Sequence, residues 1–412
     1  MELLFGSDIM DRYTASGDYE LEKKVNEVIE LIKNEIIDHA HPKSIIIKGS
    51  FGKGEITVLN EDQLKFLSDC EIVIKNNRFN ACDLSKLAQC LSQKTGLSIE
   101  IGDIELELKF CLFLNLKSRI LPTIDNYELE YGSKVIYGEN FLSSMPKLNS
   151  EDISTWEGIR LILNRMIESS CHFSSKYFNN YPSEFEERVL FFWINKILLA
   201  CQDALLILAK QYHYSYRTRN KNFQKIYPKC FKLFDDQIPN FLLLTKKATA
   251  YKLNPKEMYS KNVIDFWFDV AKIADDVFRY LIYKDLGLKF DSYKMFPNAY
   301  LSHPYIRKEY YRGLSPNPIY QNLRSSVKMW TLDRHLPTLK MMAINMTPWL
   351  HLVYSSIPLV YFSLSRNGSV DSSLLEKVKY NLSIFKKYRQ FELNSWDHVN
   401  EELFKRWTYV CY

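Results

Sequence analysis

Two carboxylates on one short apolar segment are the side chains of this chain best suited to chemistry. They are Asp69 and Glu71, within residues 68–74 (SDCEIVI). Side chains alternate along a strand, so both carboxylates face one side while Cys70 and Ile72 face the other. Neighbouring carboxylates repel each other, and burying them without a partner is costly. A divalent cation removes this conflict, because Mg²⁺ is held by one or two carboxylates plus substrate phosphates. The pattern predicts a Mg²⁺ (or Mn²⁺) site.

A glycine-rich turn precedes the carboxylates. Residues 44–47 (SIII) are mostly β-branched and apolar, which predicts a buried strand that Gly49 and Ser50 interrupt. Backbone N–H groups in such a turn can bind a phosphate, and Gly52 and Gly54 keep the backbone open to a ligand. A phosphate contact beside a carboxylate pair is therefore predicted.

This combination resembles the nucleotidyltransferase fold superfamily, the DNA polymerase β-like group, and within it the minimal, sugar- or drug-modifying type. The pattern of that group is an apolar strand, Gly-Gly or Gly-Ser, a spacer, and then Asp-x-Asp or Asp-x-Glu in a strand. Gly49-Ser50 and Asp69-x-Glu71 match those positions. The resemblance implies that Asp69 and Glu71 hold the metal, and that Gly49, Ser50 and Lys53 bind the nucleotide phosphates.

The spacer between Ser50 and Asp69 is longer than is usual in that superfamily. Residues 57–59 (TVL) and 64–67 (LKFL) flank a turn at 60–62, which is a hairpin signal. An inserted hairpin leaves the turn and the carboxylates adjacent in space.

The superfamily often uses a third carboxylate from the strand beside the acidic one. Glu100 is the first choice as metal ligand or base, because it lies near the start of residues 97–108, and Asp103 and Glu105 are alternatives. A bulge at 102–103 is predicted to reset the side-chain alternation. Any of these carboxylates could equally belong to a solvated strand face.

The remaining pattern predicts an α+β domain over residues 1–145, with a small mixed sheet flanked by helices, followed by a mostly α-helical region over 146–412. Apolar periodicity predicts helices at 19–39 and 83–96. Residues 131–138 (YGSKVIYG) resemble the segment that closes the N-terminal domain in sugar- and drug-modifying relatives. A subdivision of the helical region near 287–330 is left open.

The helical region contains two further candidates. Asp203 lies inside a long apolar helix at 187–212, where Arg160 or Arg165 could pair with it; a structural ion pair is favoured over a catalytic role. Residues 212–221 (YHYSYRTRNK) place Arg217 and Arg219 among aromatics, which suits either phosphate or base binding or an exposed helix end.

Composition narrows the class of protein. The net charge of +5 is too small to indicate nucleic-acid binding by itself. Eight cysteines form no CxxC pair, which fits a reducing cytoplasm, and the N-terminus lacks the pattern of a signal peptide. Residues 346–364 are apolar but contain Pro348 and Pro358, which favours a buried helix pair over a membrane span.

The prediction is a Mg²⁺-dependent nucleotidyltransferase that moves a nucleoside monophosphate from a nucleoside triphosphate, such as ATP, to an unidentified hydroxyl acceptor, with a small molecule favoured. One alternative is a transferase that modifies a protein or RNA, as in toxin–antitoxin systems. Another is an inactive nucleotide-binding scaffold, which the presence of Asp69, Glu71 and Gly49-Ser50 disfavours. Oligomeric state and base preference stay open.

Overall fold

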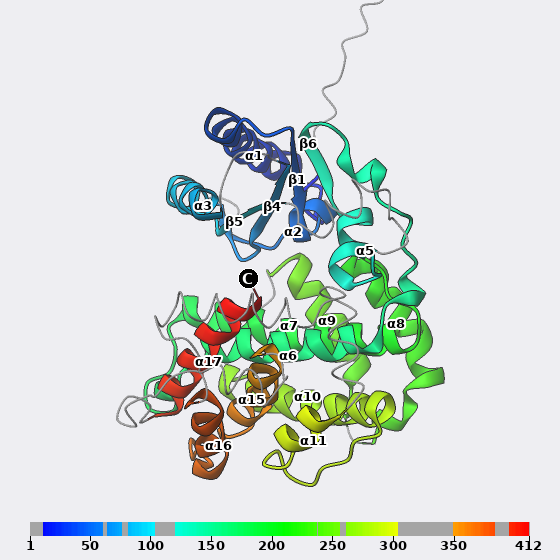
Figure 1. Ribbon diagram of the computed structural model, residues 1–412, viewed down its shortest axis with the longest axis vertical. Helices are drawn as coiled ribbons and strands as arrows, with labels where there is room; N and C mark the ends of the chain where they lie inside the picture. The colour runs from blue at the N-terminus through cyan, green and yellow to red at the C-terminus, as the bar shows by residue number, and fades with distance from the viewer. Residues whose placement is uncertain are drawn as a thin grey trace, which may run out of the picture. The chain divides into compact units, whose positions relative to one another are not determined.

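The computed structural model describes residues 11–60, 64–75, 81–103, 120–236, 238–255, 261–303, 349–383 and 395–411. Within them the chain is a mixed α/β protein in which helices dominate (Figure 1). It forms two compact units. Unit 1 comprises Met1–Ile153, Gln211–Lys225 and Lys246–Met258, and unit 2 comprises Ser154–Lys210, Ile226–Thr245 and Tyr259–Tyr412. No sequence pattern indicated the two short segments that return to unit 1.

A four-stranded mixed sheet of order β5-β4-β1-β6 forms the centre of unit 1. Its strands are β1 (Ser44–Lys48), β4 (Cys70–Lys75), β5 (Ile99–Asp103) and β6 (Lys134–Gly138). β1 runs antiparallel to both β4 and β6, whereas β4 and β5 are parallel. The predicted strands at 44–47 and 68–74 are thereby confirmed, although the second begins at Cys70, just after Asp69.

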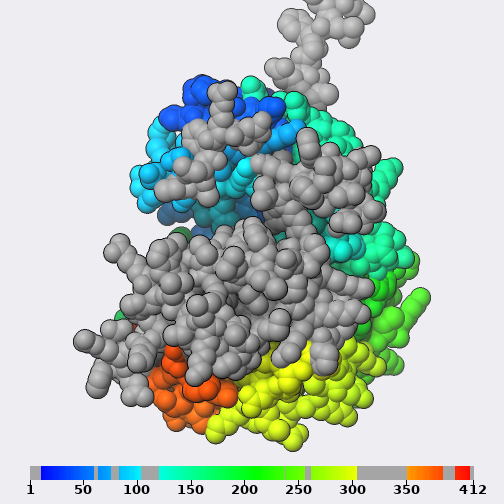
Figure 2. All heavy atoms as spheres, viewed as in Figure 1, coloured from blue at the N-terminus to red at the C-terminus, as the bar shows by residue number. Residues whose placement is uncertain are grey.

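Two amphipathic helices, α1 (Tyr19–Ala40) and α3 (Ala81–Thr95), pack against the sheet through their apolar faces. Val25 and Ile29 of α1 and Leu91 of α3 join Ile45 and Ile72 of the sheet in one buried core. Parts of both helices are visible on the face of the protein shown in Figure 2 (blue and light blue). Both predicted helices are therefore confirmed.

Short elements follow β1. Helix α2 (Gly49–Lys53) comes first, and then β2 (Val58–Asn60) and β3 (Lys65–Phe66) pair antiparallel as the predicted hairpin. Helix α5 (Ile124–Tyr131) precedes β6, and the 3₁₀ turns η2 (Phe141–Ser144) and η3 (Ser150–Asp152) follow it.

Long helices form the core of unit 2. They are α6 (Thr155–His172), α7 (Glu184–Leu208) and α10 (Val263–Leu286). Gly158 of α6 lies against Ala204 of α7 so closely that an added Cβ would be 2.9 Å from the Ala204 Cα. Among the residues described, α7 is the one helix long and apolar enough to cross a membrane, but 89% of its apolar window is buried in the protein. It is therefore the predicted central buried helix of this region.

The other helices of the described chain are α8 (Tyr216–Cys230), α9 (Phe241–Leu253), α11 (Phe296–Ser302), α15 (Trp349–Tyr361), α16 (Ser372–Ser383) and α17 (Trp396–Cys411), with 3₁₀ turns η4 (Ser175–Phe178) and η5 (Lys232–Phe234). From Trp349 on, the apolar segment is a single buried helix, so the predicted helix pair is wrong. Pro358 lies inside α15 and does not divide it.

Candidate active site

The register of the sheet brings the glycine turn to the acidic strand. Lys48, the last residue of β1, is the direct partner of Glu71 in β4. Gly49 follows with a φ of 65°, in the left-handed region that favours glycine. A Cβ at this position would lie 2.7 Å from Glu71 Oε1. The positive φ therefore favours glycine, and an added Cβ would also displace the end of the Glu71 side chain.

The alternation predicted for the acidic strand is confirmed by burial. Cys70 and Ile72 are 0% and 1% exposed, whereas Asp69 and Glu71 are partly exposed on the other face. Burial, together with the charges of Glu71 and Asp69, raises the pKa of the Cys70 thiol. Cys70 is also fully buried, which keeps its thiol away from a substrate.

Glu100 lies beside Glu71. The two residues are direct partners in the parallel pair β4–β5, so their side chains extend from the same face of the sheet. Asp103 is the partner of Ile74, further along the strand, and Glu105 lies outside the described residues. The register is unbroken as far as Asp103, so β5 shows no bulge at 102–103 up to its last residue.

The donor chemistry of Asp69 and Glu71 suits Mg²⁺, which takes oxygen ligands and leaves positions for water and phosphate. In the parts of the chain that the structure describes, no three His, Cys, Asp or Glu side chains form a group able to hold a metal ion. Glu71 and Glu100 are adjacent through the strand register, and Asp69 precedes Glu71 by two positions. Lys48 Nζ lies 3.0 Å from Glu71 Oε2, where it balances part of this negative charge.

Lys53, predicted to bind phosphate, lies in a buried ion pair. Its side chain is 3% exposed, and its Nζ is 2.6 Å from Glu128 Oε2. The other Glu128 oxygen accepts hydrogen bonds from the Tyr212 hydroxyl (2.7 Å) and from Arg219 (3.2 Å). Burial opposes ionisation of Glu128, but the charges of Lys53 and Arg219 outweigh it and hold the pKa of this carboxyl below its usual value.

A second buried lysine, Lys252 of α9, was not predicted. It is 2% exposed, and its Nζ donates to Thr57 Oγ1 (2.8 Å), Ser68 Oγ (2.9 Å) and Ser50 Oγ (3.1 Å). Its partners are about 200 positions away in sequence, and Lys246 and Lys247 precede it in the same helix. Nothing in the sequence alone distinguishes it from them.

The segment Gln211–Lys225 contributes an aromatic support to unit 1. The ring of Tyr216 lies 4.1 Å from the Arg219 guanidinium carbon, 5.2 Å from Lys53 Nζ and 5.5 Å from Lys252 Nζ. Glu55, which is 4% exposed, accepts hydrogen bonds from the backbone N–H of Tyr216 and from the hydroxyl of the preceding serine. Arg219 is 2% exposed, so it acts within the protein and not as an exposed helix end.

The remaining candidates from the sequence are Asp203 and the two arginines that were predicted as its possible partners. Asp203 is buried in α7, while Arg160 and Arg165 pair with Glu157 and Glu168 of their own helix.

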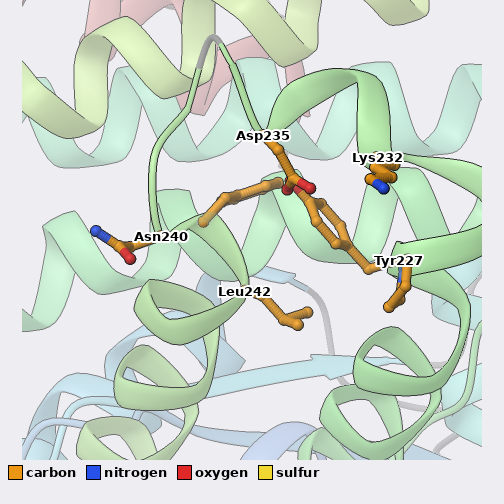
Figure 3. Close-up of a pocket in the computed structure, with 7 residues that line it drawn as sticks. Tyr227, Lys232, Asp235, Asn240 and Leu242 are labelled. Atoms are coloured by element: carbon orange, nitrogen blue, oxygen red, sulfur yellow. The ribbon is translucent and has the colours of Figure 1, made fainter.

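Unit 2 also contains a cavity of about 220 Å³, lined by Tyr227, Pro228, Lys232, Asp235, Asn240, Phe241 and Leu242. The Tyr227 ring points toward the Asp235 carboxylate, whereas the side chain of Asn240 points away from both (Figure 3). Burial and Asp235 raise the pKa of Tyr227. No residue predicted from sequence to bind nucleotide or metal lines this cavity.

Comparison with known proteins adds no assignment, since no protein-family model matches the chain and no curated protein matches its sequence.

Proposed function

We propose that the chain is a metal-dependent nucleotidyltransferase that moves a nucleoside monophosphate from a nucleoside triphosphate to a hydroxyl acceptor, with a small molecule as the acceptor. The bond between the α- and β-phosphates breaks and pyrophosphate leaves. The observation that carries this proposal is the close approach of Glu71 to Gly49. A carboxylate strand and a Gly-Ser turn that are separated by a hairpin in sequence lie so close that a Cβ on Gly49 would be 2.7 Å from Glu71 Oε1.

The proposed roles follow from chemistry and position. Asp69 and Glu71 would hold Mg²⁺, which when bound neutralises phosphate charge and lowers the pKa of an acceptor hydroxyl. Ser50 donates a hydrogen bond to a phosphate oxygen, and Gly49 leaves room for the Glu71 carboxylate. Glu100, next to Glu71 in the sheet, accepts the proton of the acceptor hydroxyl. Lys53 keeps its predicted contact with phosphate only if it exchanges Glu128 for the nucleotide.

The proposed location is the cytoplasm. Five cysteines of the described chain, among them the buried Cys70 and Cys201, are free thiols, as a reducing compartment permits.

The test is transfer of label from α-³²P-labelled ATP, CTP, GTP or UTP in the presence of MgCl₂. Acceptors are offered as three separate fractions of a cell extract: small molecules, proteins and RNA. Label in the small-molecule fraction is expected, and it should disappear with Asp69→Asn and with Glu71→Gln. The two carboxamides keep the shape of the side chains but remove their charge. If both variants fold correctly, loss of transfer reports loss of the charge alone.

Label in the protein or RNA fraction alone would support nucleotidyl transfer but would show that the acceptor is a protein or RNA and not a small molecule. No transfer to any fraction, together with no nucleotide binding by the wild-type protein, would overturn the proposal.

A further inference from the structure

We propose that Lys252 is a positioning residue that makes the Ser50 hydroxyl a hydrogen-bond donor for a nucleotide phosphate. The inference rests on the proposed function and names a residue of α9 that acts on the phosphate through Ser50. Its basis is the hydrogen bond from Lys252 Nζ to Ser50 Oγ at 3.1 Å.

The direction of this bond decides what the hydroxyl can do. A lysine ammonium has three donors and no acceptor, so Ser50 Oγ must be the acceptor. A hydroxyl has one proton, which here points away from Lys252 and remains available to a second group. In the described part of the chain, the bond from Lys252 is the one hydrogen bond of the Ser50 side chain. The arrangement suits an incoming anion, because a phosphate oxygen accepts and cannot donate when ionised.

The base of the hairpin holds the ammonium in place. Thr57 precedes β2, and its Oγ1 accepts from Lys252 Nζ while donating to the Lys252 carbonyl oxygen at 2.6 Å. Ser68 follows β3; its Oγ accepts from Lys252 Nζ and from the Thr57 backbone N–H at 2.9 Å. The two ends of the hairpin and the Gly-Ser turn therefore share one lysine. This arrangement gives the long spacer a role, because its ends supply two of the oxygens that fix Lys252.

The groups around Lys252 Nζ are of the kind that stabilises a cation. Three hydroxyl oxygens surround the ammonium, and the Tyr216 ring lies 5.5 Å away, where its π-electrons stabilise a cation. The side chain is 2% exposed, so bulk water contributes little to this stabilisation. A charged donor also polarises the Ser50 hydroxyl, because hydrogen bonds in a chain strengthen one another.

A double-mutant cycle on nucleotide binding tests the inference. Titration calorimetry measures the dissociation constant of the tightest-binding of the four triphosphates, with Mg²⁺, for wild type, Ser50→Ala, Lys252→Met and the double variant. Each single substitution should weaken binding about tenfold, the value of one hydrogen bond to a charged group. The double variant should be no weaker than either single variant, because both changes remove the same contact. The corresponding nucleoside should bind all four proteins equally.

Several outcomes would overturn the inference. Additive effects of about a hundredfold in the double variant would show that Lys252 and Ser50 act independently. Normal triphosphate binding by Lys252→Met would show that the lysine is structural only. A wild-type protein that binds no triphosphate would overturn the proposed function itself, which is a different result from additivity in a protein that does bind.

Substitution of Lys252 deprives three hydroxyls of their donor at once, so a second route uses the smaller change Ser68→Ala. This change removes one oxygen that fixes the ammonium and leaves both Lys252 and Ser50 in place. It should weaken triphosphate binding in the wild-type background but not in the Ser50→Ala background. Equal weakening in both backgrounds would contradict the inference, and circular dichroism confirms that each variant is folded.

Discussion

Lys53 and Lys252 are both buried lysines beside the ring of Tyr216, yet their surroundings differ in charge. The ammonium of Lys53 is 2.6 Å from a carboxylate of Glu128, which Arg219 also contacts. The ammonium of Lys252 donates to three hydroxyls, one of which belongs to Ser50. One lysine neutralises a buried acid, and the other directs the proton of a site hydroxyl.

This difference separates a structural cation from one that can serve a ligand. Replacing an ion-paired lysine leaves a buried charge behind, so its loss is felt mainly in stability. Replacing a lysine that donates to hydroxyls removes hydrogen bonds, but these partners include no carboxylate that would be left as an unpaired charge. The main effect of this replacement is therefore expected on nucleotide binding. Stability and binding measurements on matched variants can therefore test the contrast.

The largest expected effect is that of Lys53→Met on stability. The substitution removes one of the two cations beside Glu128, which is 18% exposed and keeps Arg219. The expected loss of unfolding free energy is therefore near the lower end of the about 3–5 kcal/mol that breaking a buried ion pair costs. Urea unfolding measures the loss. Lys94→Met is the matched control, because Lys94 pairs with Glu35 at the surface, and it should leave stability nearly unchanged. If Lys53→Met is as stable as wild type and instead loses triphosphate binding, the two lysines share one role and the contrast fails.

The local structure around this contrast could be predicted from the sequence. The β-branched run before Gly49, the hairpin and the helices at 19–39 and 83–96 all follow from local periodicity and turn residues. The strand alternation also placed Asp69 and Glu71 on the exposed side of the sheet. Such features depend on neighbours within a few residues, which is the range that a sequence pattern reports.

The partners of the two lysines could not be predicted in this way. Lys53 was assigned to phosphate through the resemblance, but its carboxylate partner, Glu128, lies 75 positions later. Lys252 meets Ser50 across 202 positions. Both contacts depend on tertiary packing, which brings Gln211–Lys225 and Lys246–Met258 into unit 1. Neither the composition nor the residue spacing of these segments indicates this packing.

The next largest effect is expected for substitution of Gly49, which lies between Ser50 and the carboxylate of Glu71. Gly49→Ala places a Cβ 2.7 Å from Glu71 Oε1 and forces a positive φ on an alanine. Strain of this kind costs about 1–3 kcal/mol. Thermal unfolding should show that loss, and nucleotide transfer should fall as well because Glu71 must move.

Gly96→Ala is the matched control for this change. Gly96 also has a positive φ, of 70°, but no atom lies within 4 Å of its added Cβ. It should lose stability from the backbone alone and keep its activity. Equal loss of activity in both variants would mean that the contact between residue 49 and Glu71 does not affect nucleotide transfer.

A smaller effect is expected in the pH dependence of stability, which depends on the ion pair between Lys53 and Glu128. The folded-state pKa of Glu128 lies below its ordinary value of 4.5. Its contribution is therefore fully present above about pH 4.5 and is lost as the pH falls through the folded pKa, with a slope of at most about 1.4 kcal/mol per pH unit. Urea midpoints measured from pH 6 down to pH 3 should fall less steeply in Glu128→Gln than in wild type. Parallel curves would show that Glu128 has no such role.

The smallest effect concerns Lys48, a third lysine, which lies at the carboxylates. Its Nζ is 3.0 Å from Glu71 Oε2 and its side chain is 34% exposed, so the pair contributes little. A divalent cation bound as proposed would share Glu71 with it. Lys48→Met should lower the Mg²⁺ concentration needed for half-maximal transfer about twofold to fivefold, because the ion no longer competes with an ammonium. Titration of transfer activity with MgCl₂ measures this shift, and Lys75→Met, at the far end of β4 from Glu71, is the control. A higher Mg²⁺ requirement in Lys48→Met would instead place Lys48 with Lys252, as a cation that assists the phosphates directly.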